Sequence, residues 1–209
     1  MDHDELAARA AVANWRGQEG AHSRELQATG PLEMEALKRF VNLWGLARSN
    51  PLERRERLLD FLNQYAIPAL KGIDPASSPS RHIYAVIEKL SQQAATTDVT
   101  NGRRPTSLLS KLGLAIRPEI FIPYDSRVNE ALAKVGKRVA AHAYGEYMLA
   151  VLSEKPVFDQ ALQNKALSAA SLGAEDMSQS LFEMRALDKR LMLRGGFNPA
   201  TLEREIRVR

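Results

Sequence analysis

The sequence predicts an all-α protein, and three observations support this prediction. Apolar residues recur at helical spacing along most of the chain, as Leu37, Phe40, Val41 and Trp44 do. Strand-like alternation of apolar and polar residues is nearly absent. The 209 residues are 44% hydrophobic and 26% charged, a composition that suits a soluble globular protein with a real core. We therefore expect a compact multi-helix domain.

The N-terminal part is expected to form a helix followed by a loop. An alanine-rich helix is predicted from Asp4 to about Arg16. Residues 17–30 are polar and interrupted by glycines, which predicts a loop. A single helical domain is then expected over 31–209. A boundary between two helical lobes, if there is one, falls in the proline- and serine-rich stretch 72–81.

Further helices are predicted along the rest of the chain. Before the centre they are expected over 32–47, from Asn50-Pro51 to a bend or end at Pro68, and over 82–95. After the centre they are expected over 125–132, 139–152, 156–170 and 176–193, with one more short helix in the tail 198–209. Gly195-Gly196 supplies the stop signal of the last long helix.

The composition excludes several classes of site. Because the chain has no cysteine, it cannot form disulfides, use a thiolate in catalysis or bind metals through cysteine. The four histidines are scattered, and none forms the pair of a helical metal site, so we expect neither metal nor cofactor. No apolar run approaches the roughly 20 residues of a membrane span, and the start, MDHDELAARA, is acidic where a signal peptide is basic. These features favour a cytoplasmic protein that does not enter a membrane.

Positive charge is concentrated in the middle of the chain. The net charge is +4, yet residues 101–145 hold eight basic residues against three acidic ones. Such a local field suits a phosphate-binding face, although a solvated helical surface gives the same pattern. In this window the candidates for binding nucleic acid are Arg103, Arg104, Thr106, Ser107, Arg127, Lys134, Lys137 and Arg138.

The most distinctive motif runs from Ser107 to Leu132, SLLSKLGLAIRPEIFIPYDSRVNEAL. Asn101-Gly102 predicts a turn before it, and Thr106 or Ser107 is expected to cap the next helix, whose N-terminus favours an anion. Lys111 lies on this helix. A partly desolvated lysine near other cations has a lowered pKa and can attack the C1′ of a sugar. The alternative is a surface lysine on an amphipathic helix.

The second half of the motif leads to Asp125. Pro118 ends the first helix, and Phe121, Ile122 and Tyr124 are expected to pack on the core. Asp125 then stands at the N-cap position of the next helix. Such a carboxylate either only caps its helix, or it also stabilises a developing oxocarbenium ion or orients the lysine.

These residues resemble those of the helix–hairpin–helix DNA glycosylases, in particular the 8-oxoguanine type with lyase activity. Those enzymes carry a lysine on the helix after a hairpin and then a proline–x–aspartate, whose places Lys111 and Pro123-Tyr124-Asp125 would occupy. The resemblance implies a helix–hairpin–helix-like centre, Lys111 as Schiff-base nucleophile, Asp125 as its partner, and a target base flipped out of the duplex. The stretches 110–128 and 182–189 also resemble small uncharacterised bacterial proteins.

The sequence therefore predicts a nucleic-acid-binding protein of DNA repair, with DNA as the expected partner and Lys111 and Asp125 as the catalytic pair. The alternative is a non-enzymatic helical module that binds other proteins, such as one in a bacterial stress or defence system. Charges at 183–189 leave a related choice open, because Arg185 and Lys189 place like charges on one helix face. A distant carboxylate or a phosphate would relieve them, and a solvated helix surface is the simpler interpretation.

Overall fold

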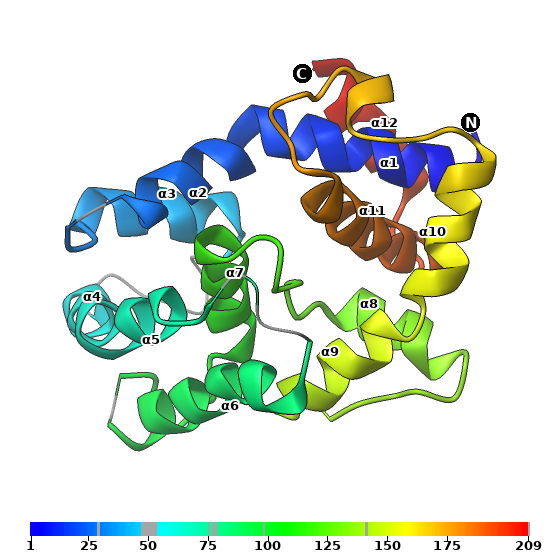
Figure 1. Ribbon diagram of the computed structural model, residues 1–209. Coiled ribbons are helices and arrows are strands. Elements are labelled where there is room, and N and C mark those ends of the chain that lie inside the picture. Colours follow the sequence, from blue (N-terminus) through cyan, green and yellow to red (C-terminus); the bar gives the residue numbers. More distant parts are fainter. Residues whose placement is uncertain are drawn as a thin grey trace.

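The fold is all-helical, as the sequence predicts. The computed structural model describes residues 1–28, 30–46, 54–74, 76, 79–97, 99–140 and 142–208, and this part of the chain contains helices and no strand (Figure 1). None of the helices in these ranges has the length and apolar character needed to cross a lipid bilayer.

A long N-terminal rod replaces the loop expected over 17–30. Helix α1 (His3–Asn14) continues through a π turn, η1 (Trp15–Glu19), into α2 (Gly20–Gln27). The prediction was wrong because Gly20 serves packing: a Cβ there would lie 2.8 Å from the Trp15 carbonyl oxygen. The polar residues of α2 also have partners, since Ser23 Oγ and Gln27 Nε2 donate to the last carbonyls of α7 (Thr106–Ile116) at 2.8 and 3.2 Å.

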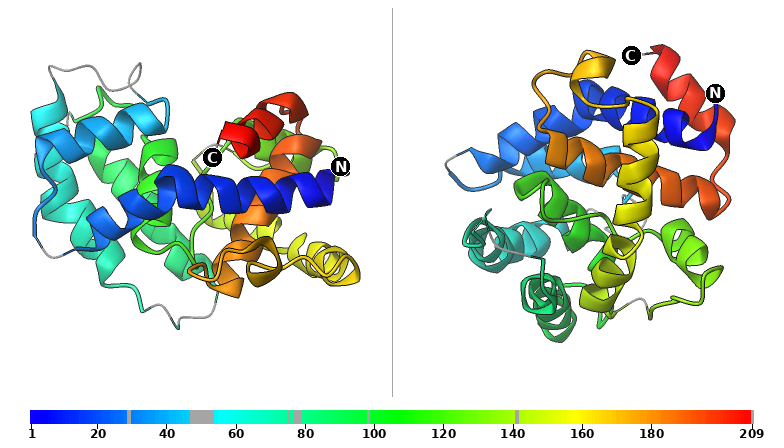
Figure 2. Two further views of the ribbon diagram at one scale, coloured as in Figure 1. Left: turned by 90° about the horizontal axis from the view of Figure 1, so that it is seen from above. Right: turned by 45° about the vertical axis from the view of Figure 1, so that its right-hand side comes forward.

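The two ends of the chain pack together. Helix α1 lies against α11 (Gln179–Arg194) and α12 (Pro199–Val208), as both views in Figure 2 show. Its alanine-rich face lets these helices approach closely, and Leu6, Leu193 and Leu202 are buried between them. This contact fixes the N-terminal rod to the last long helix.

The chain after α2 continues as further short helices. Helix α3 (Met34–Leu43) is followed by α4 (Arg55–Phe61), a π turn η4 (Leu62–Ala66) and α5 (Ile67–Lys71). Pro68 was expected to bend or end this helix, but it lies in the first turn of α5, where a missing N–H costs little and the wider π turn precedes it. The expected start at Asn50-Pro51 lies outside the described residues.

Helix α7 occupies the centre of the molecule. It follows α6 (Arg81–Thr96) after a turn in which Asn101 and Gly102 both have positive φ, as an Asn-Gly turn requires. Helices α2, α5 and α6 all contact α7 (Figure 1). Leu108, Leu109 and Leu112 of α7 are buried in the main core.

Helix α8 (Ser126–Ala133) begins as predicted, but α9 starts later than expected, at Tyr144–Leu152 rather than at Val139. The Asn129 side chain explains the delay. Its amide accepts from Val139 N at 3.1 Å and donates to Val139 O at 2.7 Å, so the backbone there is held away from helical bonding.

The last expected helix boundaries are also shifted. Helix α10 covers Lys155–Asn164 rather than continuing to residue 170, because Ala166 takes a positive φ and Leu167 N donates back to Leu162 O at 2.9 Å. A short 3-10 turn, η5 (Ala170–Leu172), precedes α11. Gly195-Gly196 ends α11 as predicted, with Gly196 at φ +94°.

Candidate active site around Lys111

The chain between α7 and α8 is tied back to α7, and this tie brings Lys111 and Asp125 to one place. Ser110 Oγ accepts a hydrogen bond from Tyr124 N at 2.8 Å. Ser107 Oγ donates to Tyr124 O at 3.4 Å. Because Ser110 precedes Lys111 and Tyr124 precedes Asp125, the two predicted catalytic residues lie on neighbouring segments.

Two buried tyrosines of α9 hold the same segment from the other side. Tyr144 Oη donates to Ile122 O at 2.6 Å, and Tyr147 Oη donates to Pro123 O at 2.9 Å. Phe121 packs so closely on Gly113 that a Cβ there would lie 3.0 Å from its ring. The segment 121–124, which contains Phe121, Pro123 and Tyr124, is therefore a rigid support for Asp125.

Asp125 caps α8 as predicted. Its side chain accepts from Arg127 N at 2.8 Å, which satisfies one of the free N–H groups at the helix start. The side chain remains partly exposed. Capping therefore leaves the carboxylate able to act on a neighbouring charge.

Lys111 is half-buried and lies against Trp44 at the end of α3. Its Nζ donates to Trp44 O at 3.3 Å and lies 5.7 Å from the centre of the indole ring. Burial lowers the pKa of the Lys111 ammonium, while the carboxylates of Asp125 and Asp188 act in the opposite direction. An ammonium group has three donors, and within the described residues the Trp44 carbonyl is its one acceptor.

The charges on α11 are buried, so their interpretation as a solvated surface was wrong. Arg185 has no exposed surface, Asp188 is 2% exposed and Lys189 is 7% exposed. Arg185 Nε and Nη2 donate to the two carboxylate oxygens of Glu19 at 3.0 and 2.6 Å, and Nη1 donates to Asp188 Oδ2 at 2.8 Å. The distant carboxylate that the sequence left open is therefore Glu19.

Asp188 links this buried cluster to Lys111. Burial raises the pKa of Asp188, against the lowering effect of the cations of Arg185 and Lys189. The second oxygen of Asp188, Oδ1, is buried without a hydrogen-bond partner. The charges of two carboxylates, Asp125 and Asp188, therefore act on Lys111, rather than the one that the sequence indicates.

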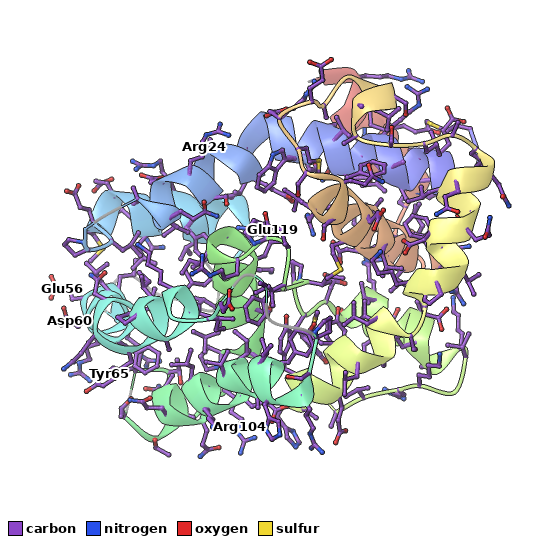
Figure 3. The ribbon with its side chains drawn as sticks, viewed as in Figure 1. Arg24, Glu56, Asp60, Tyr65, Arg104 and Glu119 are labelled. Carbon is purple, nitrogen blue, oxygen red and sulfur yellow. The ribbon has the colours of Figure 1, made fainter. Side chains whose placement is uncertain are left out.

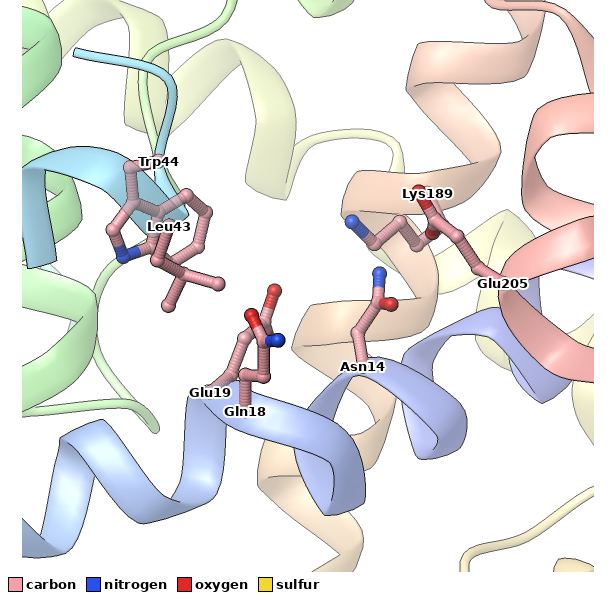
Figure 4. Close-up of a pocket in the computed structure, with 7 residues that line it drawn as sticks. All are labelled: Asn14, Gln18, Glu19, Leu43, Trp44, Lys189 and Glu205. Carbon is pink, nitrogen blue, oxygen red and sulfur yellow. The ribbon is translucent and has the colours of Figure 1, made fainter. Parts of the chain in front are cut away.

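A cavity of about 160 Å³ is lined by residues of the N-terminal rod, α3, α11 and α12, and Trp44 at the end of α3 is one of them. In Figure 4 the amine of Lys189 and the polar ends of Asn14, Gln18 and Glu19 extend toward the space between them, with the Trp44 indole opposite. Leu43 and Glu205 complete the lining. The cavity and Lys111 therefore share one aromatic side chain.

The predicted nucleic-acid-binding residues divide into three groups. Arg103, Arg104 and Arg138 are exposed, and Figure 3 shows Arg104 at the outer surface beside α6. Arg127, Lys134 and Lys137 are used in contacts inside the protein: with Gly196 O at 2.9 Å, Arg194 O at 2.6 Å, and Glu154 Oε1 at 2.8 Å.

Thr106 and Ser107 form the third group, and here the expectation of a capping side chain was wrong. Pro105 occupies the N-cap position of α7, and no side chain caps it. Thr106 is buried, and its hydroxyl bonds to Ser91 Oγ at 3.0 Å. Because the Thr106 hydroxyl already has this partner inside the core, it is not presented to a phosphate.

Comparison of the chain with protein-family models, with curated proteins and with solved structures gives no match.

Sequence reasoning missed Trp44, Glu19 and the part played by Asp188. Trp44 looked like one more apolar residue of a helix, and its position over Lys111 depends on how α3 meets α7. The like charges of Arg185 and Lys189 were the available signal for burial, because two cations on one face need a counter-charge.

Proposed function

We propose that this protein is a nucleic-acid-binding enzyme of the DNA glycosylase/lyase kind, in which Lys111 Nζ is the nucleophile and Asp125 its partner. The observation that carries the proposal is the environment of Lys111. Lys111 is half-buried and has a lowered pKa, its amine lies 5.7 Å from the centre of the Trp44 ring, and the charges of Asp125 and Asp188 act on it. A lysine whose pKa is lowered has more of the neutral amine that attacks carbon.

The reaction would begin when the neutral Lys111 amine forms a bond to C1′ of a deoxyribose. The C1′–N bond to the base breaks at the same time, and the base leaves with the electron pair and takes up a proton. The attacking nitrogen then loses its proton, and opening of the sugar ring gives an iminium. The Asp125 carboxylate would stabilise the positive charge that develops at C1′.

Positive charge supports DNA as the substrate. Arg103, Arg104 and Arg138 are exposed. Phosphate contacts of this kind supply most of the affinity for a nucleic-acid backbone. A cytoplasmic setting belongs to the same proposal. The alternative, a module that only binds proteins, predicts Lys111 in bulk solvent, and the half-buried position of Lys111 does not favour it.

Borohydride trapping tests the nucleophile. The wild-type chain, incubated with duplex DNA that contains an abasic site and then with borohydride, should form a covalent adduct that is stable on a denaturing gel. Lys111→Gln should lose this adduct, because the amide cannot form the iminium. Lys89→Gln is the matched control, since Lys89 is an exposed lysine on α6 away from the motif.

The proposal fails if the wild type gives no adduct, or if Lys111→Gln traps as well as the wild type. A circular dichroism melt of each variant would show whether loss of the adduct follows loss of the fold. Binding to unmodified duplex at several salt concentrations tests the DNA part separately, and an Arg103→Ala/Arg104→Ala variant should show weaker binding and a shallower salt dependence.

A further inference from the structure

The carboxyl ends of α2, α5 and α7 are joined by a ring of side-chain caps. Gln27, the last residue of α2, donates from Nε2 to Ile116 O at the end of α7, at 3.2 Å. Arg117, which follows α7, donates from Nη2 to Lys71 O at the end of α5. Lys71 in turn donates from Nζ to Ala28 O, just after α2, at 2.7 Å. Each helix therefore caps a terminal carbonyl of the next one.

This ring of caps borders a cavity of about 500 Å³, which is lined by Gln27, Lys71, Ile116, Arg117 and Glu119. The volume lies within the roughly 300–1,000 Å³ of pockets that take small molecules. Apart from Ile116, these residues carry polar or charged side chains. Neither Lys111 nor Asp125 is among the lining residues, so the cavity is distinct from the site of the proposed reaction.

The two cations of the ring have donors that the caps leave unused. Arg117 uses only Nη2 for hydrogen bonding within the described residues, and its Nε is buried without a partner. Lys71 uses one of the three donors of its ammonium. In the described part of the chain, both bond to main-chain carbonyls rather than to a carboxylate. Because the caps hold both side chains in place, an anionic group would meet donors that are already oriented.

Glu119 brings a negative charge to the same lining. It is exposed, lies just beyond the end of α7 (Figure 3), and makes no hydrogen bond or ion pair within the described residues. The carboxyl ends of the three helices add partial negative charge. A multiply charged anion would therefore be repelled, and a simple cation would meet Arg117 and Lys71. A ligand with one charge of each sign matches both poles of the cavity.

We propose that this cavity binds a small zwitterion of the amino-acid type, with its carboxylate on Arg117 and Lys71 and its ammonium on Glu119. Charge-assisted hydrogen bonds of this kind are among the stronger ones in proteins. Gln27 adds an acceptor, because its two printed bonds both use Nε2 and leave Oε1 for the ammonium. The inference goes beyond the proposed lyase reaction and does not depend on it.

A titration of the wild-type chain with matched small molecules tests the inference. Glycine, β-alanine and γ-aminobutyrate carry both charges, separated by progressively longer chains. Propionate lacks the ammonium, and propylamine lacks the carboxylate. At constant ionic strength, followed by calorimetry or by NMR, the best of the three zwitterions should bind about tenfold more tightly than propionate or propylamine.

Substitutions at the two poles should separate the two contacts. Glu119→Gln should remove the preference for the zwitterion over propionate, because an amide offers no charge to the ammonium. Arg117→Met should weaken binding of both the zwitterion and propionate by about tenfold. Glu175→Gln and Arg204→Met change exposed residues that do not line the cavity, and these matched controls should bind as the wild type does.

Thermal melts of the variants separate loss of binding from loss of fold. Arg117→Met also removes a helix cap, whereas Glu119 makes no hydrogen bond within the described residues. A folded Glu119→Gln therefore keeps the test informative if Arg117→Met does not fold. The inference is overturned if no zwitterion binds saturably, if propionate, propylamine or inorganic phosphate binds as tightly as the best zwitterion, or if the preference survives in Glu119→Gln.

Discussion

Helix α11 and the basic segment 101–145 are both rich in charge, yet α11 buries its charged residues and the basic segment exposes several of its own. On α11, Arg185 is completely buried and bonds to Glu19, 166 positions earlier in the chain. In the basic segment, Arg103, Arg104 and Arg138 are exposed. The difference shows that a charge pattern on one helix does not reveal its burial, because the partner that permits burial comes from another part of the sequence.

The lysines of the two regions differ in the same sense. Lys134 and Lys137 lie at the surface and are bonded to Arg194 O and to Glu154. Lys189 is 7% exposed and lines the cavity between the N-terminal rod and helices α3, α11 and α12. The burial of a lysine is therefore set by the helices that pack around it.

The largest expected effect comes from breaking the buried cluster. Arg185→Met removes a buried guanidinium that bonds to both Glu19 and Asp188, and it leaves the two carboxylates in the core without this cation. Removing one partner of a buried ion pair costs about 3–5 kcal/mol, so the free energy of unfolding in a urea titration should fall by this amount.

Arg138→Met is the matched change in the basic segment. Arg138 is exposed, so the free energy of unfolding should change by no more than about 0.5 kcal/mol. Equal effects of the two arginine substitutions would contradict the contrast between the regions.

A smaller but still large effect is expected where the two regions meet. Gly195, at the end of α11, approaches the backbone of Arg127 at the start of α8 so closely that a Cβ would lie 1.8 Å from the Arg127 carbonyl oxygen. Gly195→Ala should therefore push the helices apart and cost about 1–3 kcal/mol, measured by thermal or urea unfolding.

Gly72→Ala is the control for this close approach. Its new Cβ would lie 3.3 Å from the nearest atom, the Pro68 carbonyl oxygen, and φ at Gly72 is −71°. We expect a clearly smaller loss of stability than at Gly195. If Gly195→Ala is tolerated without loss, α8 and α11 are less closely packed than described.

The smallest effect is expected from a surface ion pair. The hydrogen bond from Lys137 is the main cause that lowers the pKa of Glu154, with burial acting in the opposite direction. Because the folded-state pKa is lowered, the pair stabilises the protein above the ordinary glutamate pKa of about 4.3, and the gain is lost as the pH falls through the lowered value.

Lys137→Met should therefore lower the free energy of unfolding by about 0.2–1 kcal/mol at neutral pH. The gap between variant and wild type should close on acidification, and added salt should reduce it as well. A gap that stays constant from neutral to acidic pH would show that the methylene stem of Lys137, rather than its charge, provides the stabilisation.

Much of the fold could be predicted from local patterns. The helices at 82–95 and 176–193, the Asn-Gly turn and the Gly195-Gly196 stop all depend on residues close together in the chain, and all were found near their expected positions. The errors have tertiary causes. Gly20 packs on Trp15, and the Asn129 side chain holds Val139 out of α9, contacts that no local window of sequence contains.

The candidate site was predicted in part. The capping role of Asp125 follows from sequence, since a capping aspartate has a local signature and Asp125 does cap α8, while the pairing of Lys111 with Asp125 stays a prediction. The setting of the pair does not follow. Trp44, Asp188 and Glu19 lie far away in the chain and reach the site only because α3, α11 and the N-terminal rod pack around α7.

The sequence by itself determined that this protein is helical, where most of its helices lie, and that Asp125 begins one of them, because helix formation and capping depend on neighbouring residues. Only the tertiary structure decided which charges are buried. Burial of a charge depends on a counter-charge from another helix. Burial lowers the pKa of Lys111. The packing of the helices also places Arg185 beside Glu19 and leaves Lys189 at the lining of a cavity.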